Sequence, residues 1–307
     1  MFKVFIDGKE GTTGLRIFER FKGRDDIEVL EISDELRKNT DERIKKIAES
    51  DVTFLCLPDA ASKEIAALTE SAATIIIDAS TAFRCDDSWA YGLPELTPDY
   101  LEKLKKAKRI SVPGCHATGA IAIIAPLVLH NIVGKNYPFV VNSLTGYSGG
   151  GKKMIAEYEN PHDAELDAPR VYGLSQTHKH LPEITKHCGL EEGPIFMPIV
   201  APYYAGMLTS VGIHTQKKVT LAQMHALFQK HYADQRFITV ADLSETPAML
   251  GSNTLAGKDG LRIWLCGNDE RITIHAQFDN LGKGASGAAI QCMNIALGID
   301  PAKGLDL

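Results

Sequence analysis

Residues 3–22 read KVFIDGKEGTTGLRIFERFK, and this stretch decides the fold class. A short apolar run leads into a loop that holds Gly8, Gly11 and Gly14, and a helical pattern follows the loop. The helix is expected to carry its apolar side chains on roughly one side, namely Leu15, Ile17, Phe18 and Phe21. A strand, a glycine-rich turn and a helix in this order are typical of the first part of an α/β sheet.

The same alternation continues through the first third of the chain. Strand-like apolar runs follow at 27–32, 52–58 and 74–80, and helical runs lie between them at 41–50 and 61–71. Because these strands are apolar along nearly their whole length, both faces of their sheet are expected to be covered by helices. We therefore predict a doubly wound, Rossmann-type parallel sheet.

The pattern changes after residue 115, where strand-like runs lie closer together. These runs are 139–148, 193–215, 236–242, 261–267 and 271–280, with helical patterns at 220–232 and 284–298. Closely spaced strands with few helices between them predict an α+β second domain with a mostly antiparallel sheet.

Composition excludes several classes of protein. The 307 residues carry a net charge of −6, which argues against a nucleic-acid surface because phosphate backbones require a basic face. The best apolar run, 120–129, is too short to span a membrane and contains Pro126. The first residues lack the pattern of a signal peptide, so we expect a cytoplasmic protein with reduced cysteines. The six cysteines form no CxxC pair, so no metal site is expected.

The glycine loop is a candidate cradle for an anion. Glycines let the backbone approach a pyrophosphate, and the following helix start supplies N–H donors. The candidate cofactor residues here are Gly8, Gly11, Thr12, Thr13 and Gly14. Their GxxGxxG spacing differs from the usual GxGxxG, so a tight turn without a ligand is the alternative.

The end of the second strand bears on which dinucleotide binds. Glu31 is placed to bind a ribose hydroxyl, as in NAD sites, whereas Ser33, Arg37 and Lys38 follow where a 2′-phosphate would lie. We favour NADP(H) because cations usually accommodate that phosphate. The alternative for this segment is a solvated charged turn.

Residues 111–120 read SVPGCHATGA and present a candidate nucleophile. The proline and glycine form a turn that delivers Cys115 to a helix start, where the thiol pKa falls and amides can hold an oxyanion. The alternative is an inert buried cysteine.

A proton-transfer partner is offered by His178 and His180, which would point the same way in an extended segment. His116 is expected to point elsewhere. A cysteine, a histidine and a dinucleotide loop suggest an oxidoreductase acting on aldehydes or acyl phosphates.

Seven segments resemble the N-acetyl-γ-glutamyl-phosphate reductase family, in its shorter branch. VPGCHATGA at 112–120 resembles the active-site signature of that family. Further segments agree in the same order, at 8–14, 54–65, 75–96, 145–153, 177–184 and 279–294. The chain departs from the longer branch at Ala205, where that branch carries arginine, and at Lys152, which replaces arginine in the 145–153 loop.

The resemblance implies a reaction and an organisation. An acyl phosphate would be reduced by NADPH through a thioester on Cys115, with His178 as acid and base. The fold would be that of semialdehyde dehydrogenases, with an NADP-binding domain over 1–114 and 282–307. Residues 115–281 would form the catalytic, substrate and oligomerisation domain of a homo-oligomer, dimer or tetramer, whose partner is a small-molecule substrate and neither nucleic acid nor membrane.

The resemblance and local chemistry also imply further site residues. The cofactor is expected to contact Pro58, Ser80, Asn280, Lys283 and Gly284. The substrate is expected to contact Arg84, Ser148, Gly149, Lys152 and His180, since hydroxyls, amides and cations suit an anion. Arg84 could instead make an interdomain salt bridge, and His180 could instead pack beneath its loop. Competing functions are an aspartate-semialdehyde-type dehydrogenase, a cysteine hydrolase and a non-catalytic NADP(H) sensor.

Overall fold

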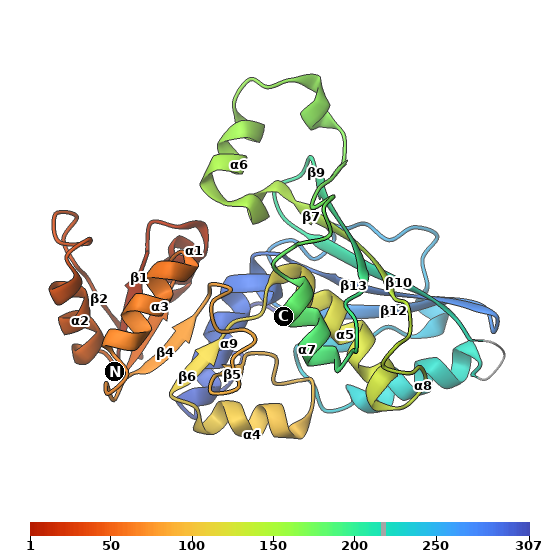
Figure 1. The fold of residues 1–307 in the computed structure, drawn as a ribbon, viewed down its shortest axis with the longest axis horizontal. Helices are drawn as coiled ribbons and strands as arrows, with labels where there is room; N and C mark the ends of the chain where they lie inside the picture. The colour runs from red at the N-terminus through yellow and green to blue at the C-terminus, as the bar shows by residue number, and fades with distance from the viewer. Residues whose placement is uncertain (216–218) are drawn as a thin grey trace. The chain divides into compact units, whose positions relative to one another are not determined.

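A computed structural model describes residues 1–215 and 219–307 of the chain (Figure 1). The chain divides into two compact units, each described by itself. Unit 1 comprises Met1–Pro113 and Ala285–Leu305, and unit 2 comprises Gly114–Gly284 and Asp306–Leu307. The assignment of cofactor binding and catalysis to these stretches stays a prediction.

Unit 1 is built on a six-stranded sheet in which every pair of neighbours runs parallel. Its spatial order is β2-β1-β3-β4-β6-β5. The strands are β1 Phe2–Asp7, β2 Ile27–Leu30, β3 Val52–Leu55, β4 Ile75–Asp78, β5 Ala90–Tyr91 and β6 Arg109–Ser111. The helices are α1 Thr12–Phe21, α2 Thr40–Glu49, α3 Asp59–Leu68, α4 Pro98–Lys106 and α9 Gly287–Ala296. The predicted doubly wound parallel sheet is confirmed.

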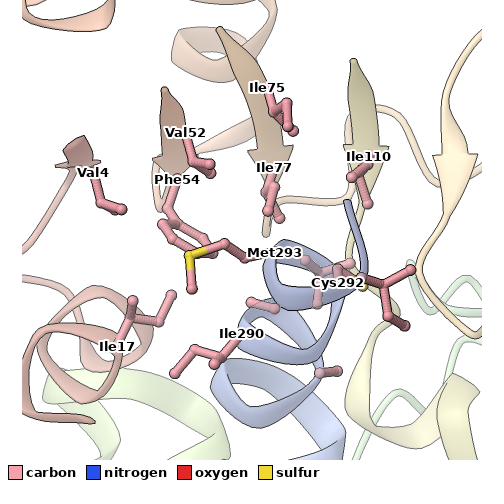
Figure 2. Close-up of a cluster of buried hydrophobic side chains, with 14 of the residues drawn as sticks. Val4, Ile17, Val52, Phe54, Ile75, Ile77, Ile110, Ile290, Cys292 and Met293 are labelled. Atoms are coloured by element: carbon pink, nitrogen blue, oxygen red, sulfur yellow. The ribbon is translucent and has the colours of Figure 1, made fainter. Parts of the chain in front are cut away.

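Successive strand residues point to opposite faces of this sheet, and both faces are buried. Ile77 of β4 faces the side where α1, α4 and α9 pack, and Figure 2 shows Ile290 and Met293 of α9 beneath it. Ile76 faces the other side, where α2 and α3 pack. Each fully buried aliphatic side chain of this kind stabilises the fold by about 1.5–3 kcal/mol. This two-sided burial explains why the strands are apolar along their whole length.

The ends of these helices follow from local sequence, with one difference from expectation. The Asn39 side chain caps α2 by accepting from the backbone N–H of Glu42 at 3.2 Å. In α1, Ile17 and Phe21 are buried, whereas Leu15 is 41% exposed. The expectation that Leu15 shares their side is wrong, because two residues of helix turn it by about 200° from Ile17.

A buried ion pair lies at the carboxyl end of β1. Asp7 accepts from Arg43 of α2 through Nη2 at 2.7 Å and through Nε at 2.9 Å. Both side chains are nearly inaccessible. Burial raises the pKa of Asp7 even though Arg43 lowers it. The pair ties α2 to the strand that leads into the glycine loop.

Unit 2 is built on a mixed, mostly antiparallel sheet of seven strands in the order β11-β12-β13-β10-β7-β9-β8. Two of its pairs, β7 with β9 and β11 with β12, run parallel. The strands are β7 Val140–Gly146, β8 Arg170–Val171, β9 Ile195–Ala201, β10 Met207–His214, β11 Ile238–Val240, β12 Leu261–Gly267 and β13 Arg271–Phe278. The helices are α5 Cys115–Leu129, α6 Gly151–Glu159, α7 Leu181–Cys188 and α8 Leu221–His231. The predicted α+β domain is confirmed.

Helix α5 is the central helix of unit 2 and packs on β10, β13 and α7. Its side chains from His116 to Val128 are buried. The helix approaches β10 closely at Gly119, where a methyl group would collide with the Thr209 hydroxyl and lie 2.8 Å from the Phe278 ring. In the part of the chain that the structure describes, no helix is long and apolar enough to cross a membrane.

Candidate active site

Cys115 is the first residue of α5 and is partly exposed. The preceding residue, Gly114, is the N-cap, and its N–H donates to the Glu183 carboxylate at 2.8 Å. Gly284 lies against the cysteine, since a Cβ there would be 2.9 Å from Cys115 Cβ. The sulfur therefore stands at the positive end of a helix, with no side chain on the residue beside it.

Three other cysteines have the environment expected of an inert thiol. Burial raises the pKa of the Cys56 and Cys188 thiols, and Asp78 adds to the effect at Cys56. Burial also raises the pKa of Cys266. Low-pKa cysteines are found at helix starts, which is the position of Cys115. The candidate nucleophile is thus distinguished by position.

His178 and His180 lie together in a turn that enters α7. The prediction of an extended segment is wrong here, because His180 is the helical N-cap of α7. Their ring centroids are nevertheless 4.7 Å apart. The His180 N–H donates to His178 Nδ1 at 3.2 Å, so neutral His178 carries its proton on Nε2. Burial lowers the pKa of His178 to about 4, and Lys179 contributes to the shift.

His116 returns to the site, contrary to expectation. Its ring centroid is 5.9 Å from that of His178 and 5.8 Å from that of His180. Its Nδ1 lies 2.7 Å from Ser143 Oγ, and its Nε2 lies 2.6 Å from the Tyr172 hydroxyl. These partners come from β7 and from the loop after β8, so spacing within 111–120 could not reveal them.

A second cluster of polar residues contains one residue predicted to bind the cofactor and two predicted to bind the substrate. Asn280, predicted for the cofactor, donates from Nδ2 to Ser148 Oγ at 2.9 Å and accepts from the Gly206 N–H at 2.9 Å. Gly149 is adjacent, since a Cβ there would lie 3.6 Å from Asn280 Nδ2. Ser148 and Asn280 are both buried. Lys152 is exposed on α6.

Lys283 and Gly284 belong to a π-helical turn, Gly282–Ser286, that leads into α9. Lys283 is only 1% exposed, and its ammonium lies 5.1 Å from the centre of the Phe237 ring. A buried lysine beside an aromatic face fixes this turn from within unit 2.

The glycine loop of unit 1 has room for backbone and little else. Gly8 has φ +88°, and a Cβ there would collide with the carbonyl oxygen of Cys56. A Cβ at Gly14 would lie 2.5 Å from the Gly8 oxygen. Gly11 is the N-cap of α1, and the buried hydroxyl of Thr12 has no hydrogen-bond partner among residues 1–215 and 219–307. Thr13 is the next residue of α1. A tightly folded glycine loop that enters a helix, with a spare hydroxyl at Thr12, fits a dinucleotide pyrophosphate.

The segment after β2 holds paired charges. Lys9 of the glycine loop binds Glu31 at 2.8 Å. Arg37 lies 3.8 Å from Asp34, and both side chains are well exposed. The Ser33 carbonyl accepts from the Arg37 N–H at 3.0 Å, so the segment forms a turn. Glu31, the group suited to an NAD ribose, is thus paired with Lys9, and its side chain remains 66% exposed.

The remaining predicted residues of unit 1 have structural contacts. Pro58 is the N-cap of α3. Ser80 donates to Asp78 at 2.6 Å. Arg84 is buried and donates to the carbonyl oxygens of Val112 at 2.8 Å and Ala79 at 3.2 Å. The structure thus gives Arg84 partners within its own unit, and its role toward substrate stays a prediction.

No group of three or more histidine, cysteine or acidic side chains suited to a metal ion is found in the two described ranges. The reasoning from sequence missed three residues that the structure brings to this site, His116, Tyr172 and Glu183. Glu183 had a signal, since it lies in the segment 177–184 that carries the histidines. No sequence motif pointed to Tyr172, because it directly follows β8, a strand of only two residues.

Comparisons with known proteins agree on a class. A family model described as semialdehyde dehydrogenase, NAD binding domain, matches residues 3–104, and one described as semialdehyde dehydrogenase, dimerisation domain, matches residues 115–280. Aspartate semialdehyde dehydrogenase II from Vibrio cholerae has a TM-score of 0.72 at 17% identity, covering 97% of this chain and 99% of that one. The aspartate semialdehyde dehydrogenase from Francisella tularensis has a TM-score of 0.70 at 16% identity, with 96% and 99% covered. The fold is that of the semialdehyde dehydrogenases.

Closer relatives define the family within that class. N-acetyl-gamma-glutamyl-phosphate reductase from Rhizobium etli is 43% identical over 305 residues, covering 96% of this chain and 98% of the relative. The enzyme of that name from Brucella suis is 42% identical over 306 residues, with 96% and 99% covered. The chain belongs to the N-acetyl-γ-glutamyl-phosphate reductase family. The family model over residues 3–104 supports a nicotinamide dinucleotide as the class of cofactor.

Proposed function

We propose that this chain reduces N-acetyl-γ-glutamyl phosphate to N-acetyl-glutamate 5-semialdehyde with NADPH, as a cytoplasmic enzyme of arginine biosynthesis. The observation that carries the proposal is Cys115 at the start of α5 together with His178, whose tautomer is set by the His180 N–H. The names of relatives that are 42–43% identical over 96% of the chain support the choice of substrate.

In the proposed reaction the Cys115 thiolate forms a bond to the γ-carbonyl carbon, and the bond to phosphate breaks. Phosphate leaves with its electron pair, so this step needs little help from an acid. NADPH, when bound, supplies a hydride to the thioester carbon. His178 Nε2–H donates a hydrogen bond to the resulting oxyanion, and the C–S bond then breaks to give the aldehyde and the Cys115 thiolate. The amides of α5 stabilise the oxyanion.

The substrate phosphate is proposed to bind at Ser148, Gly149 and Lys152. The Ser148 hydroxyl is fixed by Asn280, and Lys152 adds a positive charge from α6. Arg84 and His180 remain proposed substrate contacts. Arg84 already carries two backbone carbonyls, so only its remaining N–H groups would be used.

The cofactor is proposed to be NADP(H), bound at the glycine loop, Pro58, Ser80, Asn280, Lys283 and Gly284, with its 2′-phosphate near Ser33 and Arg37. The ammonium of Lys9, which lies beside Glu31, supports this choice, because cations near this point usually accommodate the 2′-phosphate. Ser33→Ala and Arg37→Ala should each lower the preference for NADP over NAD by about tenfold or more. A wild-type enzyme that prefers NAD would contradict the assignment.

A homo-oligomer, dimer or tetramer, is proposed through unit 2. Apolar side chains on neighbouring strands of its sheet, β7, β9 and β8, are exposed, namely Val140, Ile195 and Val171. The family model over residues 115–280 is described as a dimerisation domain, which supports the proposal. Sedimentation at several protein concentrations tests it, and a monomer at micromolar concentration would contradict it.

The reaction is tested in reverse, with N-acetyl-glutamate 5-semialdehyde, phosphate and NADP, by the absorbance of the reduced cofactor. Cys115→Ser should lose at least about 10³-fold in rate, and His178→Asn about 10²–10⁴-fold. Cys85→Ser, an exposed cysteine, is the matched control and should keep full rate. Activity that needs no phosphate, or that survives Cys115→Ser, would refute the mechanism. Aspartate semialdehyde assayed in parallel separates the related dehydrogenase activity.

A further inference from the structure

We propose that His116 is a positioning residue that holds the Tyr172 hydroxyl toward the Cys115 sulfur, so that Tyr172 donates a hydrogen bond to the thiolate. The proposal rests on the role of Cys115 as nucleophile in the proposed function. It assigns a role to two residues that the reaction scheme above does not use.

Four polar side chains form a continuous hydrogen-bonded chain inside unit 2. Thr209 Oγ1 lies 2.8 Å from Ser143 Oγ, which lies 2.7 Å from His116 Nδ1. On the other side of the ring, His116 Nε2 lies 2.6 Å from the Tyr172 hydroxyl. Thr209, Ser143 and His116 are essentially inaccessible to water. The chain ends at Tyr172, which is only partly buried.

The tyrosine ring also faces the predicted acid and base. Its centroid is 5.7 Å from that of His178 and 6.0 Å from that of His116. His116 directly follows Cys115 at the start of α5, so the bond between His116 Nε2 and the Tyr172 hydroxyl joins Tyr172 to the residue next to the nucleophile. Burial and the negative charge of Cys115 both raise the pKa of Tyr172, so the hydroxyl keeps its proton.

The protonation state of His116 fixes the direction of these bonds. Burial, with the neighbouring His178 and Lys179, lowers its pKa to about 3, so the ring is neutral at pH 7. A neutral imidazole donates from one nitrogen and accepts at the other. If Nε2 carries the proton, His116 donates to the Tyr172 oxygen, and the tyrosine proton is free to point elsewhere. If Nδ1 carries it, the tyrosine proton is used on His116.

A thiolate at Cys115 favours the first arrangement. Its charge attracts the Tyr172 proton, and Tyr172 can then accept from His116 Nε2–H. His116 Nδ1 in turn accepts from Ser143, and Ser143 accepts from Thr209. Each of the four side chains then has a hydrogen-bond partner, and each hydrogen bond is donated in the direction of the Cys115 sulfur. The fold thus gives Cys115 a side-chain donor in addition to the α5 amides.

The test measures the thiolate directly, through the rate of alkylation of Cys115 by iodoacetamide as a function of pH. The Cys115 peptide is quantified by mass spectrometry, because other cysteines also react. Tyr172→Phe removes only the hydroxyl and should raise the apparent pKa of Cys115 by about one unit. Alkylation at pH 7 should then be about tenfold slower.

The role of His116 has its own variants. His116→Leu should reproduce the shift of Tyr172→Phe, and His116→Gln, whose amide reaches toward Tyr172, should recover most of it. Ser143→Ala removes the hydrogen-bond partner of His116 Nδ1 and should shift the pH profile of Cys115 alkylation in the same direction, but by less. If His116→Leu does not fold, the result for Ser143→Ala decides whether the proposal holds. Tyr232→Phe is the matched control, since it removes a buried tyrosine hydroxyl that donates to the Ala122 carbonyl at 2.8 Å.

A wild-type profile in Tyr172→Phe overturns the proposal. So does a wild-type profile in folded His116→Leu, or in Ser143→Ala where the leucine variant does not fold. A glutamine variant no better than the leucine variant also overturns it. Alkylation needs neither substrate nor cofactor. A failed reductase assay with a shifted alkylation profile therefore refutes the proposed substrate and leaves this inference intact.

Discussion

Acid should destabilise unit 2 through one buried side chain, His116. The ordinary pKa of histidine is 6.5, and burial lowers that of His116 to about 3. The unfolded chain therefore binds a proton that the folded chain excludes at any pH between these values. The stability that depends on neutral His116 is fully present above pH 6.5 and is lost as the pH falls through 6.5 toward 3.

The size of the effect follows from the same values. Each pH unit inside this window removes about 1.4 kcal/mol of stability for one fully excluded proton. Lowering the pH from 7 to 5 should therefore reduce the free energy of unfolding by about 2 kcal/mol through His116 alone. His116 is only 1% exposed, so solvent does not screen the effect.

Urea unfolding at pH 7 and pH 5 measures it. Trp89→Phe removes the tryptophan of unit 1, and Trp264 of β12 then reports on unit 2 alone. Carboxylates and His178 shift stability with pH as well, so the wild-type residue is compared with His116→Gln in this background. The loss between the two pH values should be about 2 kcal/mol smaller in the glutamine variant, or about 1 M in the urea midpoint. Equal losses in both proteins would refute the reasoning.

Three further substitutions test the packing and charge of the fold by thermal unfolding. Gly119→Ala should destabilise by about 1–3 kcal/mol because α5 has no room for a methyl group, whereas Gly212→Ala, where a Cβ meets nothing, should not. A loss below about 0.5 kcal/mol at Gly119 would show that α5 can move away. Asp7→Asn leaves a buried guanidinium without its charge partner and should cost about 3–5 kcal/mol, against almost nothing for exposed Asp34→Asn. Equal effects of the two would contradict the burial argument. Asn39→Ala should cost about 1 kcal/mol, and no change would mean that the α2 cap is replaced by water.

Much of the fold could be predicted because its signals are local. The apolar residues of 74–80 alone predict a strand that is buried on both faces. The glycines from Gly8 to Gly14 likewise predict a βα turn without reference to any other segment. The error at Leu15 arose because apolar residues were grouped by nearness in sequence, while a helix separates neighbours by about 100° per residue.

The site was predicted less completely, for a different reason. Cys115 and His178 each lie in a short motif, so each could be predicted from its own segment of the sequence. The contacts of His116 with Ser143 and Tyr172 join three segments separated by 27 and 56 residues. Asn280 and Ser148 are 132 residues apart. No pattern of spacing records such pairs, because they are created when the strands of unit 2 assemble side by side.

The hydrogen bond from Gly114 to Glu183 ties the start of α5 to the first turn of α7. Gly114 directly precedes Cys115, and Glu183 lies three residues after His180, the N-cap of α7. The helix that begins with the predicted nucleophile and the helix that follows the predicted acid and base are thereby held in one register.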